Sequence, residues 1–210
     1  MKTDILSLIN GNPETIHRTG FCGFKGATCM QHIDAFSALY DLINEMNIRS
    51  IIEIGSAAGG LTTFLSETVK DLNTPCTIDS YELKDRPYFD QLRSENVNIH
   101  IGSVWEEECI NSIGDLIQQP RPVLVLCDGG NKIKEFNTFS KYLKPGDIIM
   151  CHDYSKDREM FENQIKDNIW NWCEVTYEDI ESSVHENHLT PYNEQLFQQC
   201  VWSCFTKTAQ

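Results

Sequence analysis

Basic residues are scarce in this chain. It has 17 Lys and Arg residues against 31 Asp and Glu residues among 210, which gives a formal net charge of -14 at pH 7. Proteins that hold nucleic acids or anionic membranes attract them with clustered positive charge, and the sequence contains no basic patch. We therefore expect neither a nucleic acid nor a membrane as the main partner.

Long apolar runs and paired cysteine motifs are also missing. No segment approaches the length of a membrane span, and residues 1–10 are too short and too polar for a secretory signal. Nine cysteines are scattered without a Cys-x-x-Cys pair, which favours free thiols in a reducing compartment. The expected compartment is the cytoplasm. Because there is no repeat and no linker, we predict one domain over residues 1–210.

Residues 50–64 form the strongest local pattern. An apolar strand that contains Glu53 runs into a glycine-rich turn, and apolar residues then recur at helical spacing. Such a turn lets the backbone approach a ligand closely. Gly55, Ala57 and Gly60 match the dinucleotide pattern Gly-x-Gly-x-x-Gly only approximately. Three hypotheses therefore remain open: an NAD site, an S-adenosylmethionine (SAM) site, and a tight turn without a ligand.

Polar residues follow the next two predicted strands. The strand at 77–81 is followed by Glu82, and a carboxylate at this position can accept hydrogen bonds from both ribose hydroxyls of a nucleotide. The alternative for Glu82 is an ordinary solvated loop acid. The strand at 97–101 is followed by Ser103 and Val104, which offer a backbone donor and an apolar edge to a ligand.

Three further polar residues end the next two predicted strands. Asp128 follows an apolar strand at 123–127, while His152 and Asp153 end the strand that begins at 147. Because the carboxyl ends of parallel strands share one edge of a sheet, we expect these side chains to lie close to the glycine turn. Buried strand ends are a costly place for unpaired carboxylates, so we predict a functional cluster. The alternative is that the two acids cap nearby helices.

The predicted architecture is a three-layer α/β/α sandwich around a seven-stranded sheet. The strands are expected to begin near residues 50, 77, 97, 122, 147, 169 and 199, with six parallel and the last antiparallel. A helix is expected over residues 156–168. Residues 1–30 are predicted to form an arm over the site, and residues 178–194 a long acidic loop. His185 and His188 in that loop are either a metal-binding pair or solvated residues.

The order of elements over residues 20–207 resembles that of class I SAM-dependent methyltransferases, which have a Rossmann-like fold. Glu53-x-Gly55-x-x-x-Gly59-Gly60 is similar to motif I of that class. The run Lys-Pro-Gly-Asp-x-Ile-x-x-His-Asp-Tyr is similar to metal-dependent small-molecule O-methyltransferases of the cephalosporin hydroxylase-like, macrolide-sugar and catechol types. Three residues before the first strand support this resemblance, namely Gly26, Gln31 and Asp34.

This resemblance implies the following ligands. SAM would contact Glu53, Gly55, Ser56, Ala57, Gly59, Gly60, Glu82, Ser103, Val104 and Asp128. A divalent cation, usually magnesium, would be held by Asp128, His152 and Asp153. The families usually have an acid where this chain has His152. Because imidazole is a poor ligand for magnesium, manganese, iron or zinc remains an alternative.

The resemblance also implies an activity, which is methyl transfer to a hydroxyl of a sugar, phenol or natural product. In catechol-type enzymes a lysine base lies three residues after the first metal acid. Asn131 occupies that position here and Lys132 follows it, so the candidate catalytic bases are Lys132 and His152. The rival hypotheses are an NAD-binding oxidoreductase and a non-catalytic SAM-binding module. A homo-oligomer is compatible with each of these functions.

Overall fold

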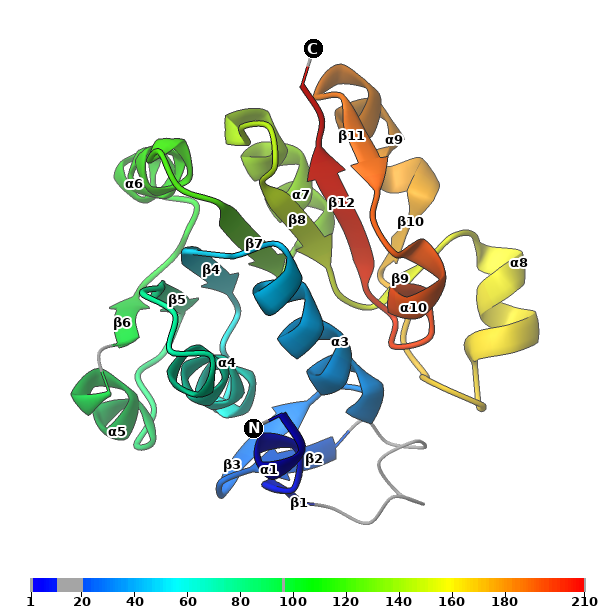
Figure 1. The fold of residues 1–210 in the computed structure, drawn as a ribbon. Helices are drawn as coiled ribbons and strands as arrows, with labels where there is room; N and C mark the ends of the chain where they lie inside the picture. Colours follow the sequence, from blue (N-terminus) through cyan, green and yellow to red (C-terminus); the bar gives the residue numbers. More distant parts are fainter. Residues whose placement is uncertain (1, 11–20, 96, 210) are drawn as a thin grey trace.

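The computed structural model describes residues 2–10, 21–95 and 97–209 (Figure 1). Its centre is a seven-stranded sheet with the strand order β11-β12-β8-β7-β4-β5-β6. In that order the strands are Leu189–Pro191, Ser203–Lys207, Ile148–Cys151, Val123–Cys127, Ser50–Ile54, Thr77–Glu82 and Val97–Ile101.

The strand directions agree with the predicted fold class. β4 pairs in parallel with β5 and β7, β5 pairs in parallel with β6, and β7 pairs in parallel with β8. β12 is antiparallel to β8, and β11 is antiparallel to β12. β11 therefore runs with the five parallel strands, and β12 alone is reversed. The three-layer, mostly parallel α/β fold is confirmed.

Helices cover both faces of the sheet (Figure 1). The first face carries α3 (Ile33–Glu45), α4 (Gly60–Asp71), α5 (Phe89–Ser94) and α10 (Glu194–Gln198). The second carries α6 (Glu107–Gln118), α7 (Lys132–Phe139) with the 3-10 turn η1 (Ser140–Tyr142), and α9 (Tyr177–Glu186). Alternation along β4 creates the two cores, because Ile51 packs into the first and Ile52 and Ile54 into the second.

The predicted strand at residue 169 is wrong, because β11 takes its place in the sheet. Within 169–177 only β10 (Val175–Thr176) is extended, and it pairs with β9 (Tyr154–Ser155) in a separate two-stranded sheet. Trp170 instead packs with Phe161 in a small side cluster. The expected helix 156–168 is reduced to α8 (Arg158–Met160) and the π-helix η2 (Phe161–Ile165). The apolar residues of this segment therefore serve a local core.

The predicted acidic loop 178–194 is also wrong, since it contains most of α9 and all of β11. Thr176 and Asp179 form a capping box at the start of α9. Ile180 and Val184, four residues apart, are buried. His185 is exposed, and its Nε2 lies 3.7 Å from Oε1 of Glu181. Neither it nor His188 belongs to the group of metal-ligating side chains found among the described residues.

The amino-terminal arm is folded where it is described. It contains α1 (Lys2–Leu6) and a small antiparallel sheet of β1 (Ile9–Asn10), β2 (Phe21–Phe24) and β3 (Ala27–Met30). β2 and β3 are joined by a two-residue turn, Lys25 and Gly26, both with positive φ. β3 packs on α4, which places the end of the arm beside the glycine turn.

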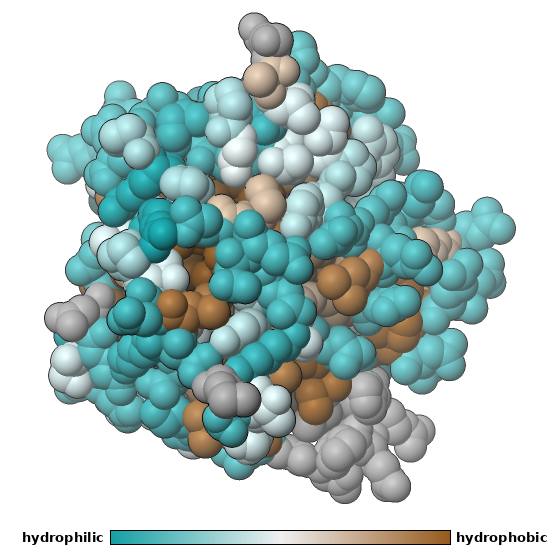
Figure 2. All heavy atoms as spheres, in the orientation of Figure 1, coloured by the Kyte–Doolittle hydropathy of each residue, from teal (hydrophilic) through white to brown (hydrophobic). Residues whose placement is uncertain are grey.

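Three further properties concern the described residues as a whole. No helix among the described residues is long and apolar enough to cross a membrane. The face shown in Figure 2 is largely hydrophilic, with hydrophobic residues exposed in separate patches. All nine cysteines are free.

Candidate active site

The glycine turn after β4 is shaped mainly by the backbone that packs against it. Gly55 has a φ of 90°, and a Cβ there would lie 2.3 Å from the carbonyl oxygen of Asp128. A Cβ on Gly60 would lie 2.4 Å from the carbonyl oxygen of Thr28 in the arm. Gly59 has a φ of 85° and faces α5. The turn therefore packs against three other segments of the chain. Of its three glycines, Gly55 alone lines the two cavities of the site.

The first cavity, of about 470 Å³, opens beside this turn at the ends of β4, β5, β6 and β7. Six of the residues predicted to contact the cofactor are on its walls: Gly55, Ala57, Glu82, Ser103, Val104 and Asp128. The Glu82 carboxylate accepts a hydrogen bond of 3.0 Å from the backbone N–H of Ala57, which holds it at the cavity edge. The cavity therefore has one fixed acid at the position expected for a ribose-binding residue.

The remaining walls come from residues that were not predicted as cofactor contacts. They are Ile54, Tyr81, Leu83, Gly102, Trp105, Gly129, Gly130 and Glu135. Glu135 shapes the loop after β7, because its carboxylate accepts hydrogen bonds from the backbone N–H groups of Gly129 and Asn131. Burial raises the pKa of Glu135 to about 6. The sequence could not reveal these hydrogen bonds between the Glu135 side chain and the backbone.

Glu53 lies behind the turn and is fully buried. Its Oε2 accepts hydrogen bonds of 2.6 Å from the hydroxyls of Thr62 and Ser80. Its Oε1 has no partner among the described residues. Burial raises the pKa of Glu53 to about 7, despite the two hydroxyl donors. Glu53, Ser56, Gly59 and Gly60 were predicted to contact the cofactor, but they do not line either cavity.

The second cavity, of about 230 Å³, shares Gly55, Ala57 and Asp128 with the first, so the two spaces meet at Asp128. Its walls combine the arm, α4, the ends of β7 and β8, and the segment before β10. The other lining residues are Cys29, Met30, Gln31, Leu61, Lys132, His152, Asp153, Trp170, Trp172 and Glu174. The arm therefore contributes directly to a cavity.

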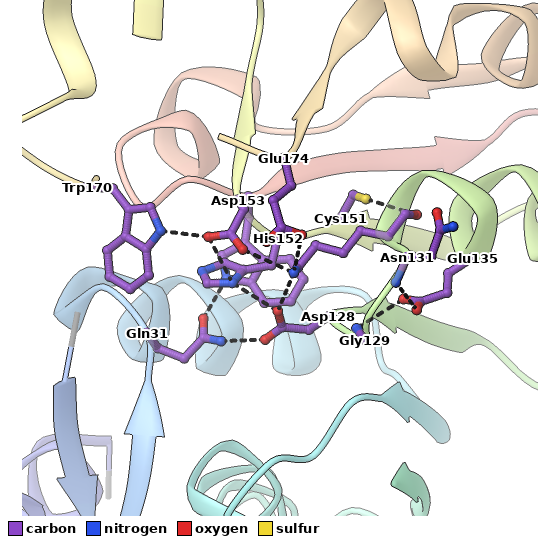
Figure 3. A network of polar contacts seen from close by, with 12 residues as sticks. Gln31, Asp128, Gly129, Asn131, Glu135, Cys151, His152, Asp153, Trp170 and Glu174 are labelled. Atoms are coloured by element: carbon purple, nitrogen blue, oxygen red, sulfur yellow. Dashed lines mark hydrogen bonds and ion pairs between the residues drawn. The ribbon is translucent and has the colours of Figure 1, made fainter. Parts of the chain in front are cut away.

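The predicted polar cluster lines the second cavity, and Figure 3 shows its side chains directed toward one another. Asp128, His152 and Asp153 each offer a metal-ligating atom, and these atoms all lie within 4.8 Å of one another. His152 Nδ1 is 3.0 Å from Asp128 Oδ1 and 3.6 Å from Asp153 Oδ1. Parallel strand ends thus place two carboxylates and one imidazole together, as the strand order predicts.

Lys132 supplies an internal cation to this cluster. Its Nζ lies 3.0 Å from Asp153 Oδ2, 2.8 Å from Glu174 Oε2 and 3.9 Å from Asp128 Oδ1. Burial lowers the pKa of Lys132, but Asp128 and Asp153 outweigh burial and hold this pKa above its ordinary value. Lys132 is therefore an ammonium at neutral pH.

Two buried indoles and one amide hold the carboxylates in place. Trp170 Nε1 donates to Asp153 Oδ1 at 2.6 Å, and Gln31 Nε2 donates to Asp128 Oδ2 at 2.8 Å. The Gln31 amide is oriented by Trp202, whose Nε1 donates to Gln31 Oε1 at 2.8 Å. Every oxygen of the two carboxylates thus has a nitrogen within 3.0 Å.

His152 is buried between Trp170 and Trp202, at ring-centroid distances of 5.3 and 4.8 Å. Burial lowers the pKa of His152, but Asp128 and Asp153 outweigh burial and raise this pKa above 6.5. Burial raises the pKa of Asp153, but His152 and Lys132 outweigh it, so the pKa of Asp153 is lowered. His152 Nε2 has no partner among the described residues, which leaves one ring nitrogen available to a ligand.

Comparison with known proteins gives a family match over most of the chain. The model of a family described as rhamnosyl O-methyltransferase/CmcI matches residues 19–207. No curated protein sequence matches.

Several solved structures share the fold. A "CmcI-N160 apo-structure" is 14% identical, with a TM-score of 0.66 over 90% of this chain and 76% of that chain. A structure described as "cmcI-D160 Mg-SAM" is 13% identical, with a TM-score of 0.61 over 89% of this chain and 76% of that chain. A putative caffeoyl-CoA O-methyltransferase from Staphylococcus aureus is 12% identical, with a TM-score of 0.52 over 82% of each chain.

Proposed function

The chain belongs to the rhamnosyl O-methyltransferase/CmcI family of SAM-dependent methyltransferases, and we propose that it methylates a hydroxyl oxygen of a small molecule. The observation that carries this proposal is that two cavities meet at Asp128. The first is built for the methyl donor, and the second brings an acceptor to the polar cluster. An in-line transfer requires this arrangement, because donor and acceptor must meet at one point.

The residues around the first cavity fit SAM, which supplies an electrophilic methyl group on a sulfonium. Glu82 would accept hydrogen bonds from the ribose hydroxyls, while Ser103 and Val104 would border the adenine. The unpartnered Oε1 of Glu53 would accept from the amino group, directly or through water. Asp128 would lie nearest the sulfonium, where its negative charge favours the cation.

The polar cluster fits a divalent cation, which would lower the pKa of a bound hydroxyl and fix its position. Asp128 and Asp153 would hold it, with His152 as a third ligand in the alternative in which His152 is not the base. Three carboxylates, including Glu174, surround one ammonium, so the cluster retains negative charge for a further cation. One imidazole beside two carboxylates favours manganese, iron or zinc over magnesium, although the related "cmcI-D160 Mg-SAM" structure contains magnesium.

His152 is the residue we assign as the proton acceptor. Lys132 was the other candidate, but its raised pKa keeps it protonated at neutral pH. An imidazole titrates closer to neutral pH, and His152 lines the second cavity with one ring nitrogen unpartnered among the described residues. Lys132 would instead stabilise the neighbouring carboxylates.

The experiment is a transfer assay with labelled SAM and a panel of sugars, phenols and natural products. Calorimetry with S-adenosylhomocysteine and with NAD is run first. Tight NAD binding without a response to S-adenosylhomocysteine would favour the oxidoreductase hypothesis. Binding of S-adenosylhomocysteine without transfer to any acceptor, with or without metal, would favour a non-catalytic module.

Chelation then tests the metal. We expect EDTA to abolish turnover and added Mn²⁺ or Mg²⁺ to restore it, whereas Asp153→Ala should remain inactive with metal present. Asp90→Ala, at an acid whose side chain is 88% exposed, is the matched control. Full turnover in EDTA together with an active Asp153→Ala variant would show that no metal takes part. His152→Ala should be inactive, and unchanged metal content in that variant would make His152 a base and not a ligand.

A further inference from the structure

Three large hydrophobic side chains that line the two cavities are exposed. Among the described residues, five large hydrophobic side chains are exposed: Met30, Leu83, Ile101, Trp172 and Leu196. Met30 and Trp172, each 41% exposed, line the second cavity. Leu83 lines the first. An apolar surface left open beside polar groups is typical of a ligand-binding site.

Met30 and Trp172 come from separate elements that border the second cavity. Met30 ends β3 of the arm, where exposed residues alternate with buried ones, so its side chain points away from the core. Trp172 lies in the segment between η2 and β10. It contacts Trp170 edge to face, with ring centroids 5.5 Å apart. Trp170 is buried and donates a hydrogen bond to Asp153. Trp172 therefore packs on a side chain that the polar cluster holds in place.

The charge around this cavity disfavours an anionic ligand. Asp128, Asp153 and Glu174 line it, and Lys132 is the one ammonium among its lining residues. The Glu174 side chain is 51% exposed, so its charge faces an entering ligand. The cavity volume of about 230 Å³ is below the range of about 300–1,000 Å³ that is typical of sites for drug-sized ligands. It therefore suits a single ring.

From these observations we propose that Met30 and Trp172 form the walls of an acceptor subsite that takes an uncharged ring bearing a hydroxyl group. The ring face stacks on the Trp172 indole and contacts the Met30 thioether. The hydroxyl points inward, to Asp128 and His152. This subsite rests on the proposed function, because it identifies the methyl acceptor by its chemistry.

The test measures binding and not turnover, so it separates this subsite from the proposed activity. The protein is saturated with S-adenosylhomocysteine and treated with EDTA, because catechols chelate metals. Catechol, methyl α-D-mannopyranoside and anionic 3,4-dihydroxybenzoate are then titrated by calorimetry. The first two probes separate a phenolic acceptor from a sugar. We expect at least one of them to bind about tenfold more tightly than the benzoate.

Variants locate the binding surface. Trp172→Ala should weaken the uncharged probe about tenfold, Trp172→Phe should restore most of the affinity, and Met30→Ala should weaken it about threefold. Leu196→Ala, at a residue 42% exposed outside both cavities, should bind as the wild type does. The subsite is wrong if neither uncharged probe binds, if Trp172→Ala binds normally, or if the benzoate binds best. Probe binding while no acceptor of the panel is methylated, with or without metal, would leave the subsite standing and overturn the proposed activity.

Discussion

Replacing Glu53 by glutamine should remove a large part of the pH dependence of stability. Glu53 is fully buried, and its pKa is raised to about 7 by that burial. In Glu53→Gln the amide oxygen can still accept from Thr62 and Ser80, as Oε2 does in the wild type. The substitution therefore keeps the shape and these two hydrogen bonds but removes the ionisable group.

The magnitude follows from the proton that the folded protein retains. Between pH 4.5, the ordinary pKa, and about pH 7, the unfolded chain releases the proton of Glu53 while the folded protein keeps it. Because the unfolded state binds fewer protons in this window, stability falls as pH rises. At about 1.4 kcal/mol per pH unit, the complete loss is about 3 kcal/mol. The effect is absent below pH 4.5 and complete above pH 7.

Urea unfolding at pH 4.5 and pH 8 measures the pH-dependent loss of stability directly. The proteins compared are the wild type, Glu53→Gln and the exposed control Glu107→Gln. We expect the stability of the wild type relative to Glu53→Gln to fall by about 3 kcal/mol between these pH values, and the control to follow the wild type. A parallel pH dependence in the wild type and Glu53→Gln would refute the reasoning. We also expect weaker SAM binding by Glu53→Gln, because an amide does not attract the amino group's charge.

Three further predictions follow from the site. Lys132→Met should bind Mn²⁺ about tenfold more tightly or better in calorimetry, because the ammonium near Asp153 repels a cation; unchanged or weaker binding would contradict this. Gln31→Met should lower the free energy of unfolding in urea by about 2 kcal/mol or more, because it leaves buried polar partners unsatisfied; wild-type stability would count against it. Gly60→Ala should lower the free energy of unfolding by about 1–3 kcal/mol, because the added methyl group would press on the arm. Gly130→Ala, at a position with open space, should leave stability unchanged, and equal urea midpoints for the two variants would contradict the predicted clash.

The parts of the fold that are encoded locally could be predicted from the sequence. The parallel strands are short apolar runs that end in polar residues, and the turn after β4 has its glycines in sequence. The sixth strand could not be found this way. Leu189–Pro191 is only three residues long and ends in a proline, while Trp170 and Val175 suggest a strand that does not join the main sheet. Tertiary packing decides between these two segments.

The site shows the same division between local and distant contacts. The strand order brings Asp128, His152 and Asp153 together, and that follows from the rule for parallel sheets. One partner of Lys132, Glu174, is 42 residues away, so the sequence alone could not reveal the ion pair that this candidate base forms. The sequence also could not show that the backbone of the arm packs closely against Gly60.

The two carboxylates of the cluster are held by hydrogen bonds and an ion pair from other side chains of the protein. Gln31 and Trp170 donate to the carboxylates, and the Lys132 ammonium neutralises part of their charge. Buried carboxylates without such partners would be strongly unfavourable. The protein thus holds Asp128 and Asp153 in place from its own side chains. We therefore expect the two carboxylates to keep their positions when the protein is free of metal, so that a cation would find its ligands already in place.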